Sequence, residues 1–132
     1  MSDSIEKIGV MVLEPQAALL QKLCDITSCI WGEDEVLPRM SAKECAYANK
    51  LLDFEVVVVR ATFARSSPLI ESALIDSFAR GAHIIILQDT GRKLSEYGTV
   101  SMGRLHMMSD KASDQDLMDL LTLCKIRSIV NL

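Results

Sequence analysis

The strand signal that decides the fold lies at the centre of the chain, where residues 54–60 read FEVVVVR. Four β-branched residues in a row, Val56–Val59, strongly favour a strand. An uninterrupted apolar run is typical of a strand covered on both faces, as in a parallel sheet. Residues 8–13 (IGVMVL) and 84–87 (IIIL) share this character. The sequence therefore predicts a central sheet that is buried on both faces.

Amphipathic segments separate these apolar runs and indicate helices. Ser41 and Glu44 form a capping-box pattern at the start of one of them. Another is opened by the cap-and-proline sequence Ser67-Pro68 and ended by Gly81. The helices we predict run from Pro15 to about Ile30, from Ser41 to about Leu52, from Pro68 to about Arg80, and onward from Ser113.

Two weaker strands complete the pattern, at Glu35–Met40 and Arg104–Met108. Pro38 cannot complete a ladder, so its strand belongs at a sheet edge. The polar segment Thr90–Gly98 predicts a short helix at most. Five strands alternating with four or five helices predict an α/β class, three-layer α/β/α domain over residues 1–132. The expected parallel sheet has the order 2-1-3-4-5, which places Pro38 at an edge.

Composition and charge narrow the class of protein. A length of 132 residues fits one domain. The formal net charge of −4 disfavours direct binding of nucleic acid. The sequence has neither a signal-peptide pattern nor an apolar run of about 18 residues, so no membrane contact and a cytoplasmic location are expected.

The cysteines and histidines give no recognisable metal pattern. The four cysteines, Cys24, Cys29, Cys45 and Cys124, form no CxxC pair, and the chain has two histidines. We interpret the cysteines as small core residues in a reducing compartment, with a thiol sensor as the alternative. The loop after the first strand lacks the glycines that a flavin phosphate needs, and no Ser-His-Asp arrangement is apparent. No cofactor, no metal and no enzymatic activity are predicted.

The order and spacing of these elements resemble the receiver domain of two-component response regulators across nearly the whole chain. That resemblance implies a flavodoxin-like sheet with its site beyond the carboxyl ends of the strands. Receivers carry an acidic pair after the first strand and a phosphorylated Asp after the third. Ser or Thr follows the fourth strand and Lys follows the fifth. The acidic residues bind Mg²⁺, which neutralises charge during phosphoryl transfer.

This sequence keeps one carboxylate of the acidic pair, Glu14, and departs from the receiver pattern at the other positions. The residues that stand at the receiver positions are Glu14, Pro15, Arg60, Gln88 and Asp110. Lys111, one residue past Asp110, is the equivalent lysine if the register slips by one. Asp89 beside Gln88 adds to a polar cluster expected with Asp110.

Arg60 is the most consequential departure, because a guanidinium cannot accept a phosphoryl group and would repel Mg²⁺. The nearest carboxylates, Asp53 and Glu55, precede the valine run and so belong to the wrong end of the strand. The sequence predicts a degenerate receiver, or pseudo-receiver, that lacks the phosphoacceptor. Glu14 and Arg60 should emerge from adjacent strands, and two interpretations stay open: an ion pair in place of the metal, or two solvated loop residues.

The function expected from this resemblance is a non-catalytic signalling module that acts by protein–protein interaction without phosphorylation. Its partner would be a kinase, a phosphotransfer protein, an output domain or, in a homodimer, its own copy. The chain would be a stand-alone protein or the amino-terminal domain of a longer regulator. The expected interaction face includes Arg92, Tyr97, His106 and Met108.

Three alternatives stay open at this point. One is a conventional phosphorylated receiver whose register differs from the one above. The others are a flavodoxin-like protein that binds a small ligand, and the thiol sensor.

Overall fold

A computed structural model describes residues 6–88 and 99–130 of the chain, and within them six strands form one sheet. Their spatial order is β2-β1-β3-β4-β6-β5. The strands are β1 (Glu6–Leu13), β2 (Val36–Arg39), β3 (Leu52–Arg60), β4 (His83–Gln88), β5 (Val100–Met102) and β6 (Leu105–Ser109). All neighbours are parallel except β5 and β6.

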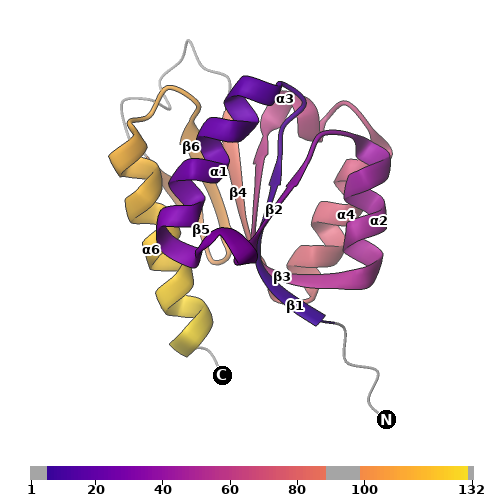
Figure 1. The fold of residues 1–132 in the computed structure, drawn as a ribbon. Coiled ribbons are helices and arrows are strands. Elements are labelled where there is room, and N and C mark those ends of the chain that lie inside the picture. Colours follow the sequence, from indigo (N-terminus) through magenta and orange to yellow (C-terminus); the bar gives the residue numbers. More distant parts are fainter. Residues whose placement is uncertain (1–5, 89–98, 131–132) are drawn as a thin grey trace.

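Helices cover both faces of this sheet. They are α1 (Ala17–Trp31), η1 (Glu33–Glu35), α2 (Ala42–Leu51), α3 (Ala61–Ala64), α4 (Pro68–Ala79) and α6 (Asp114–Val130). Figure 1 shows α1 and α6 on one side of the sheet and α2 and α4 on the other. The predicted three-layer α/β/α architecture is therefore confirmed.

The valine run of β3 explains why two layers of helices are needed. Val56 and Val58 point into a core shared with α1 and α6, whereas Val57 and Val59 point into the core under α2 and α4. All four side chains are buried. Burying a valine contributes roughly 1.5–3 kcal/mol relative to leaving it exposed, so both helical layers are needed to cover this strand.

The ends of the helices follow the sequence signals closely. The Ser41 hydroxyl accepts a hydrogen bond from the Glu44 backbone N–H at 3.2 Å, and Ser67 caps α4 in the same manner. Gly81, just past α4, adopts a φ of +106°, which favours glycine. Helix α1 begins at Ala17, two residues later than expected. The expected short helix at Thr90–Gly98 lies outside the described residues.

The edge position of the proline strand is confirmed. Strand β2 pairs only with β1, in a register that sets Pro38 opposite Val12. Proline lacks an N–H, so an outer strand loses the least from its presence.

The prediction of five strands in the order 2-1-3-4-5 is wrong in one respect. A sixth strand, β5, adds an antiparallel edge beside β6. The two are joined by Gly103-Arg104, and Gly103 has a φ of +60° while no non-glycine residue in the described chain has a positive φ. A two-residue loop with glycine first matches a type II′ hairpin turn, so the signal was present in the sequence.

Candidate functional site

The site expected from the sequence lies where β1 and β3 end. These strands are adjacent and parallel, and Leu13 pairs with Val59 in their register. Glu14 and Arg60 therefore leave the sheet at the same edge. Side chains alternate along a strand, so both residues share the α1/α6 face.

Glu14 and Arg60 form an ion pair in this position. The Arg60 guanidinium donates from Nη2 to Oε2 of Glu14 at 2.9 Å. The same carboxylate oxygen accepts the Gln16 backbone N–H at 3.0 Å. Of the two interpretations that the sequence left open, the structure contains the ion pair.

The carboxylate of this ion pair is fully buried and its guanidinium is partly exposed, so the pair differs energetically from a surface ion pair. The Glu14 side chain is 0% exposed and the Arg60 side chain is 20% exposed. A partly exposed pair would contribute about 0–1 kcal/mol. Removing one partner of a buried pair instead leaves an uncompensated charge in the interior, which costs several kcal/mol. The pair therefore holds the ends of β1 and β3 in one arrangement.

Several polar atoms beside the pair have no hydrogen-bond partner among the described residues. They are Oε1 of Glu14, Nε of Arg60 and Oδ1 of Asp110. Arg60 and Asp110 both line a cavity of about 90 Å³ between α1 and α6, with Lys22 and Asp114 at its margin. Buried polar groups are rarely left unpaired, so these atoms mark the most unusual polar environment near the sheet edge.

Gln88 and Pro15 do not join this cluster. Gln88 alternates with Leu87 and so points to the α2/α4 face, where its Nε2 contacts the Met107 sulfur at 3.6 Å. Its backbone oxygen accepts the Asp110 N–H at 2.9 Å, so the two residues are linked through their backbones. Pro15 and Lys111 are exposed. The side chains of Gln88 and Asp110 therefore do not form the expected polar cluster, and Asp89 lies outside the described residues. Asp110 instead lines a cavity together with Arg60.

Two residues of the expected interaction face, His106 and Met108, are buried in this structure. His106 is 0% exposed and Met108 is 1% exposed, because α6 covers the face of β6 from which both side chains point. Buried side chains cannot contact a partner in this conformation. Arg92 and Tyr97 lie outside the described residues.

A second cluster was missed by the sequence analysis. His83 on β4, His106 on β6 and Cys124 on α6 are buried together, with their ligand atoms within 4.8 Å of one another. Strands β4 and β6 are neighbours in the sheet. His83 lies two residues before Ile85 and His106 lies two residues before Met108, and both of these apolar side chains belong to the core under α1 and α6. Because side chains alternate along a strand, the two histidines point to that same face. No local spacing signal reveals this cluster, since 18 residues separate even the nearest pair.

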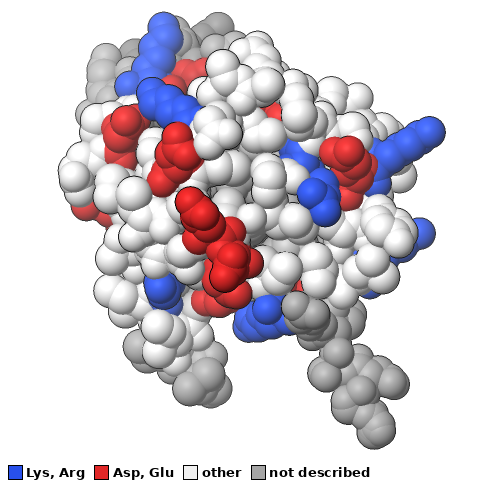
Figure 2. Space-filling model, viewed as in Figure 1, with Lys and Arg blue, Asp and Glu red and all other residues white. Residues whose placement is uncertain are grey.

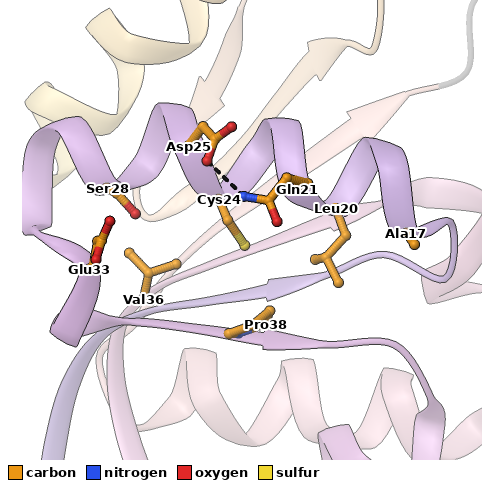
Figure 3. A pocket seen from close by; sticks show the side chains of 9 residues that line it. All are labelled: Ala17, Leu20, Gln21, Cys24, Asp25, Ser28, Glu33, Val36 and Pro38. Carbon is orange, nitrogen blue, oxygen red and sulfur yellow. Dashed lines mark hydrogen bonds between the residues drawn. The ribbon is translucent and has the colours of Figure 1, made fainter.

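A hollow of about 380 Å³ lies between α1 and β2. Figure 3 shows Gln21 and Asp25 hydrogen-bonded along its rim, and Cys24 turned toward Pro38. Desolvation by burial, and then the neighbouring Asp25, raise the pKa of the Cys24 thiol. Burial raises the pKa of Cys45 to about 11 and that of Cys124 to about 12. Such thiols form little thiolate, which argues against the thiol-sensor alternative at these three positions.

The surface charge is mixed on the face that Figure 2 shows. Acidic side chains gather near the middle of this view, with basic side chains scattered around them. The view contains no continuous basic surface of the kind that binds a phosphate backbone. Within residues 6–88 and 99–130, no helix combines the length and hydrophobicity that a membrane span requires.

Comparison with known proteins places the fold. No protein-family model matches the chain, and no curated protein matches it. Among solved structures, a response regulator receiver domain protein from Clostridium thermocellum superimposes with a TM-score of 0.66 at 14% identity. That match covers 95% of this chain and 99% of the other. A response regulator from Colwellia psychrerythraea gives a TM-score of 0.58 at 11% identity, over 94% and 99% of the two chains. The chain therefore has a receiver-like fold.

Proposed function

We propose that this chain is a receiver-like signalling module in which the buried Glu14–Arg60 ion pair takes the place of a phosphorylation switch. The single observation that carries the proposal is the guanidinium of Arg60, held 2.9 Å from Glu14 at the end of β3. The resemblance to receivers assigns the phosphorylated Asp to this position. A fixed cation here leaves no carboxylate to accept a phosphoryl group.

The same ion pair also disfavours binding of the Mg²⁺ ion that phosphoryl transfer requires. Mg²⁺ needs near-octahedral oxygen ligands, which receivers supply from neighbouring acidic residues. One oxygen of Glu14 is already occupied by Arg60 and by the Gln16 N–H. The positive charge of Arg60 would repel a dication that approached the remaining oxygen. The site accordingly favours a single state that is independent of phosphate.

A module without a switchable site acts through its surface, so the partner is a protein. Exposed apolar side chains lie on α2 and α4, two helices that pack against each other. Tyr47 and Leu51 of α2 and Ile75 of α4 are each more than half exposed. Apolar side chains grouped on a surface favour protein contact. A kinase, a phosphotransfer protein, an output domain or a second copy of the chain would each be a partner of this class.

The decisive experiment is an amide NMR titration with Mg²⁺ followed by beryllofluoride, a phosphoryl mimic. We expect no coordinated shifts at Glu14, Arg60 and Asp110 in the wild-type protein. Joint shifts of these three amides on beryllofluoride would overturn the proposal and identify a conventional phosphorylated receiver.

A charge-reversed variant sharpens this experiment. Arg60→Asp places a carboxylate beside Glu14, so we expect it to gain Mg²⁺-dependent shifts at residues 14 and 110. Arg65→Asp makes the same change of charge at an exposed position after α3 and should gain none. Equal responses in the two variants would show that general charge, rather than the position of Arg60, governs metal binding.

A further inference from the structure

The buried cluster of His83, His106 and Cys124 lies apart from the proposed switch region and has no role in it. His83 begins β4, His106 lies on the adjacent β6, and Cys124 lies on α6, which covers this face of the sheet. The three residues are 2%, 0% and 0% exposed. Three elements that are distant in sequence thus bring two imidazoles and one thiol close together inside an otherwise apolar core.

Hydrogen bonds already link the members of this cluster. Nδ1 of His83 lies 3.0 Å from Nε2 of His106, and Sγ of Cys124 lies 3.6 Å from the same Nε2. The two imidazole planes are 15° apart with centroids separated by 5.3 Å. That separation is about the N···N distance plus two ring radii, so the rings meet edge to edge with a shared proton between the nitrogens.

In one of the two neutral tautomers of His106, the donors of this cluster outnumber its acceptors. Ser101 Oγ lies 2.7 Å from Nδ1 of His106, and this contact fixes the orientation of the ring. If His106 donates from Nδ1 to Ser101, its Nε2 has a single lone pair. An N–H from His83 and the S–H of Cys124 then converge on that one lone pair. A cation at the centre would instead use one lone pair from each of the three residues.

We propose that His83, His106 and Cys124 form a buried three-coordinate site for a soft monovalent metal ion, Cu(I). Thiolate and imidazole are the ligands that copper prefers, and two histidines with one cysteine make a trigonal donor set. In a trigonal centre, metal–nitrogen bonds of about 2.0 Å and metal–sulfur bonds of about 2.3 Å place ligand atoms about 3.5–3.7 Å apart. Nε2 of His106 lies 3.0 Å from Nδ1 of His83 and 3.6 Å from Sγ of Cys124, and all three ligand atoms lie within 4.8 Å of one another. Metal binding therefore requires the two rings to turn so that these spacings become more even.

Charge favours a monovalent ion over Zn²⁺ at this position. The field of the Arg127 guanidinium reaches both imidazoles and the Cys124 thiol, and that of Arg104 reaches His83. A Cu⁺ ion bound to one thiolate makes a neutral centre, whereas Zn²⁺ would leave a buried positive charge beside these cations. Zn²⁺ also prefers four ligands in structural sites, and the cluster found within the described residues supplies three.

Metal binding exchanges a proton for the ion at this centre. Each imidazole offers one nitrogen lone pair, and the thiol gives up its proton: Cys–SH and Cu⁺ give Cys–S–Cu and H⁺. One proton is released for each ion bound, and no electron is transferred.

A hollow of about 290 Å³ borders one member of the cluster. It reaches His83 and is bordered by Lys7, Glu55 and Arg104. Ser101, which holds the distal nitrogen of His106, supplies the outer hydrogen bond that metal-binding histidines usually make.

The test is an anaerobic titration of the whole chain with Cu(I) against a competing Cu(I) chelator, followed by NMR of the histidine rings. The chain has two histidines, so every imidazole signal reports on this cluster. We expect one Cu(I) per chain, shifts in both sets of imidazole signals and release of one proton. Zn²⁺ should bind more weakly under the same conditions. Unmoved imidazole signals at one equivalent of Cu(I), or tighter binding of Zn²⁺, would overturn the assignment.

Matched cysteine variants identify the sulfur ligand. Cys124 and Cys45 are both 0% exposed, but Cys45 lies in the core under α2 and α4. Cys124→Ala should weaken Cu(I) binding more than about 100-fold, whereas Cys45→Ala should leave it unchanged; Ser101→Ala should cost roughly 10–100-fold. Retention of full affinity in Cys124→Ala would sink the proposal. If that variant does not fold, the imidazole shifts of the wild-type protein decide the question alone.

Discussion

The buried polar groups on the two sides of the sheet differ in how completely they are hydrogen-bonded. Under α2 and α4, Asn49 bonds to Asp76, to Ser77 and to Arg80, so its side-chain oxygen and nitrogen are both satisfied. On the α1/α6 face, buried atoms of Glu14, Arg60, Trp31 and Asp110 have no hydrogen-bond partner among the described residues. The difference separates polar groups that hold the architecture from polar groups that are candidates for function.

One atom under α2 and α4 looks like an exception to this contrast. Oδ1 of Asp53 has no hydrogen bond among the described residues, but it lies 3.1 Å from Nη1 of Arg80. Its charge is therefore compensated by the same arginine that bonds to Asn49. The satisfied network and the unsatisfied cluster remain distinct.

The largest expected effect comes from breaking the ion pair on the α1/α6 face. Arg60→Ala leaves the fully buried Glu14 carboxylate without its cation, so the free energy of unfolding should fall by about 3–5 kcal/mol. Urea denaturation followed by circular dichroism measures this loss.

A double variant separates charge from packing at this pair. Glu14→Leu combined with Arg60→Met replaces both ions with apolar side chains and should recover most of the lost stability. If the double variant is as unstable as Arg60→Ala, the pair contributes through shape rather than through compensation of charge.

The same face contains a close contact that tests how tightly α1 packs. A Cβ built on Gly9 would lie 2.3 Å from Cδ1 of Trp31, at the carboxyl end of α1. Gly9→Ala should therefore displace the indole and lower the free energy of unfolding by about 1–3 kcal/mol. Tryptophan fluorescence reports the change directly, because Trp31 is the only tryptophan in the chain.

Its control is a second change in the same pair. Trp31→Leu removes the clash, so adding Gly9→Ala to that variant should cost much less than adding it to the wild type. Equal costs in the two backgrounds would place the strain at the backbone rather than at the indole.

The satisfied network on the opposite face predicts a smaller loss. Asn49→Ala removes the acceptor of Ser77 and one partner each of Asp76 and Arg80. Ser77 is buried, whereas the two charged groups still pair with each other at 3.5 Å. We expect a loss of about 1–2 kcal/mol in urea denaturation. A cost that equals that of Arg60→Ala would erase the distinction between the two faces.

Parallel-strand logic was sufficient to predict part of the candidate site from the sequence. Glu14 and Arg60 each follow an apolar run, and parallel strands end at one edge, so their proximity could be foreseen. Gln88 stands at the carboxyl end of β4, but its side chain points to the α2/α4 face, because side chains alternate along a strand. His106 and Met108 were placed on the expected interaction face by the resemblance to receivers, and both side chains are buried in this structure.

Other features depend on packing that no local pattern encodes. The cluster of His83, His106 and Cys124 requires the register of β4 against β6 and the placement of α6 over both. Strand β5 was different, because the Gly103-Arg104 turn could have been recognised before the structure was known. The turn could therefore be predicted from neighbouring residues in the sequence, whereas the meeting of three distant elements could not.

The smallest expected effect comes from an ion pair that looks similar in sequence terms but lies in solvent. Lys22 and Asp114 join α1 to α6 at 3.4 Å, with both side chains 60% exposed. Water and salt screen such a pair, and two long side chains lose freedom in forming it. Lys22→Ala should therefore change the free energy of unfolding by less than about 0.5 kcal/mol in the assay used for Arg60→Ala. A loss comparable to that of Arg60→Ala would mean that contact between α1 and α6, rather than burial of charge, determines which ion pairs matter on this face.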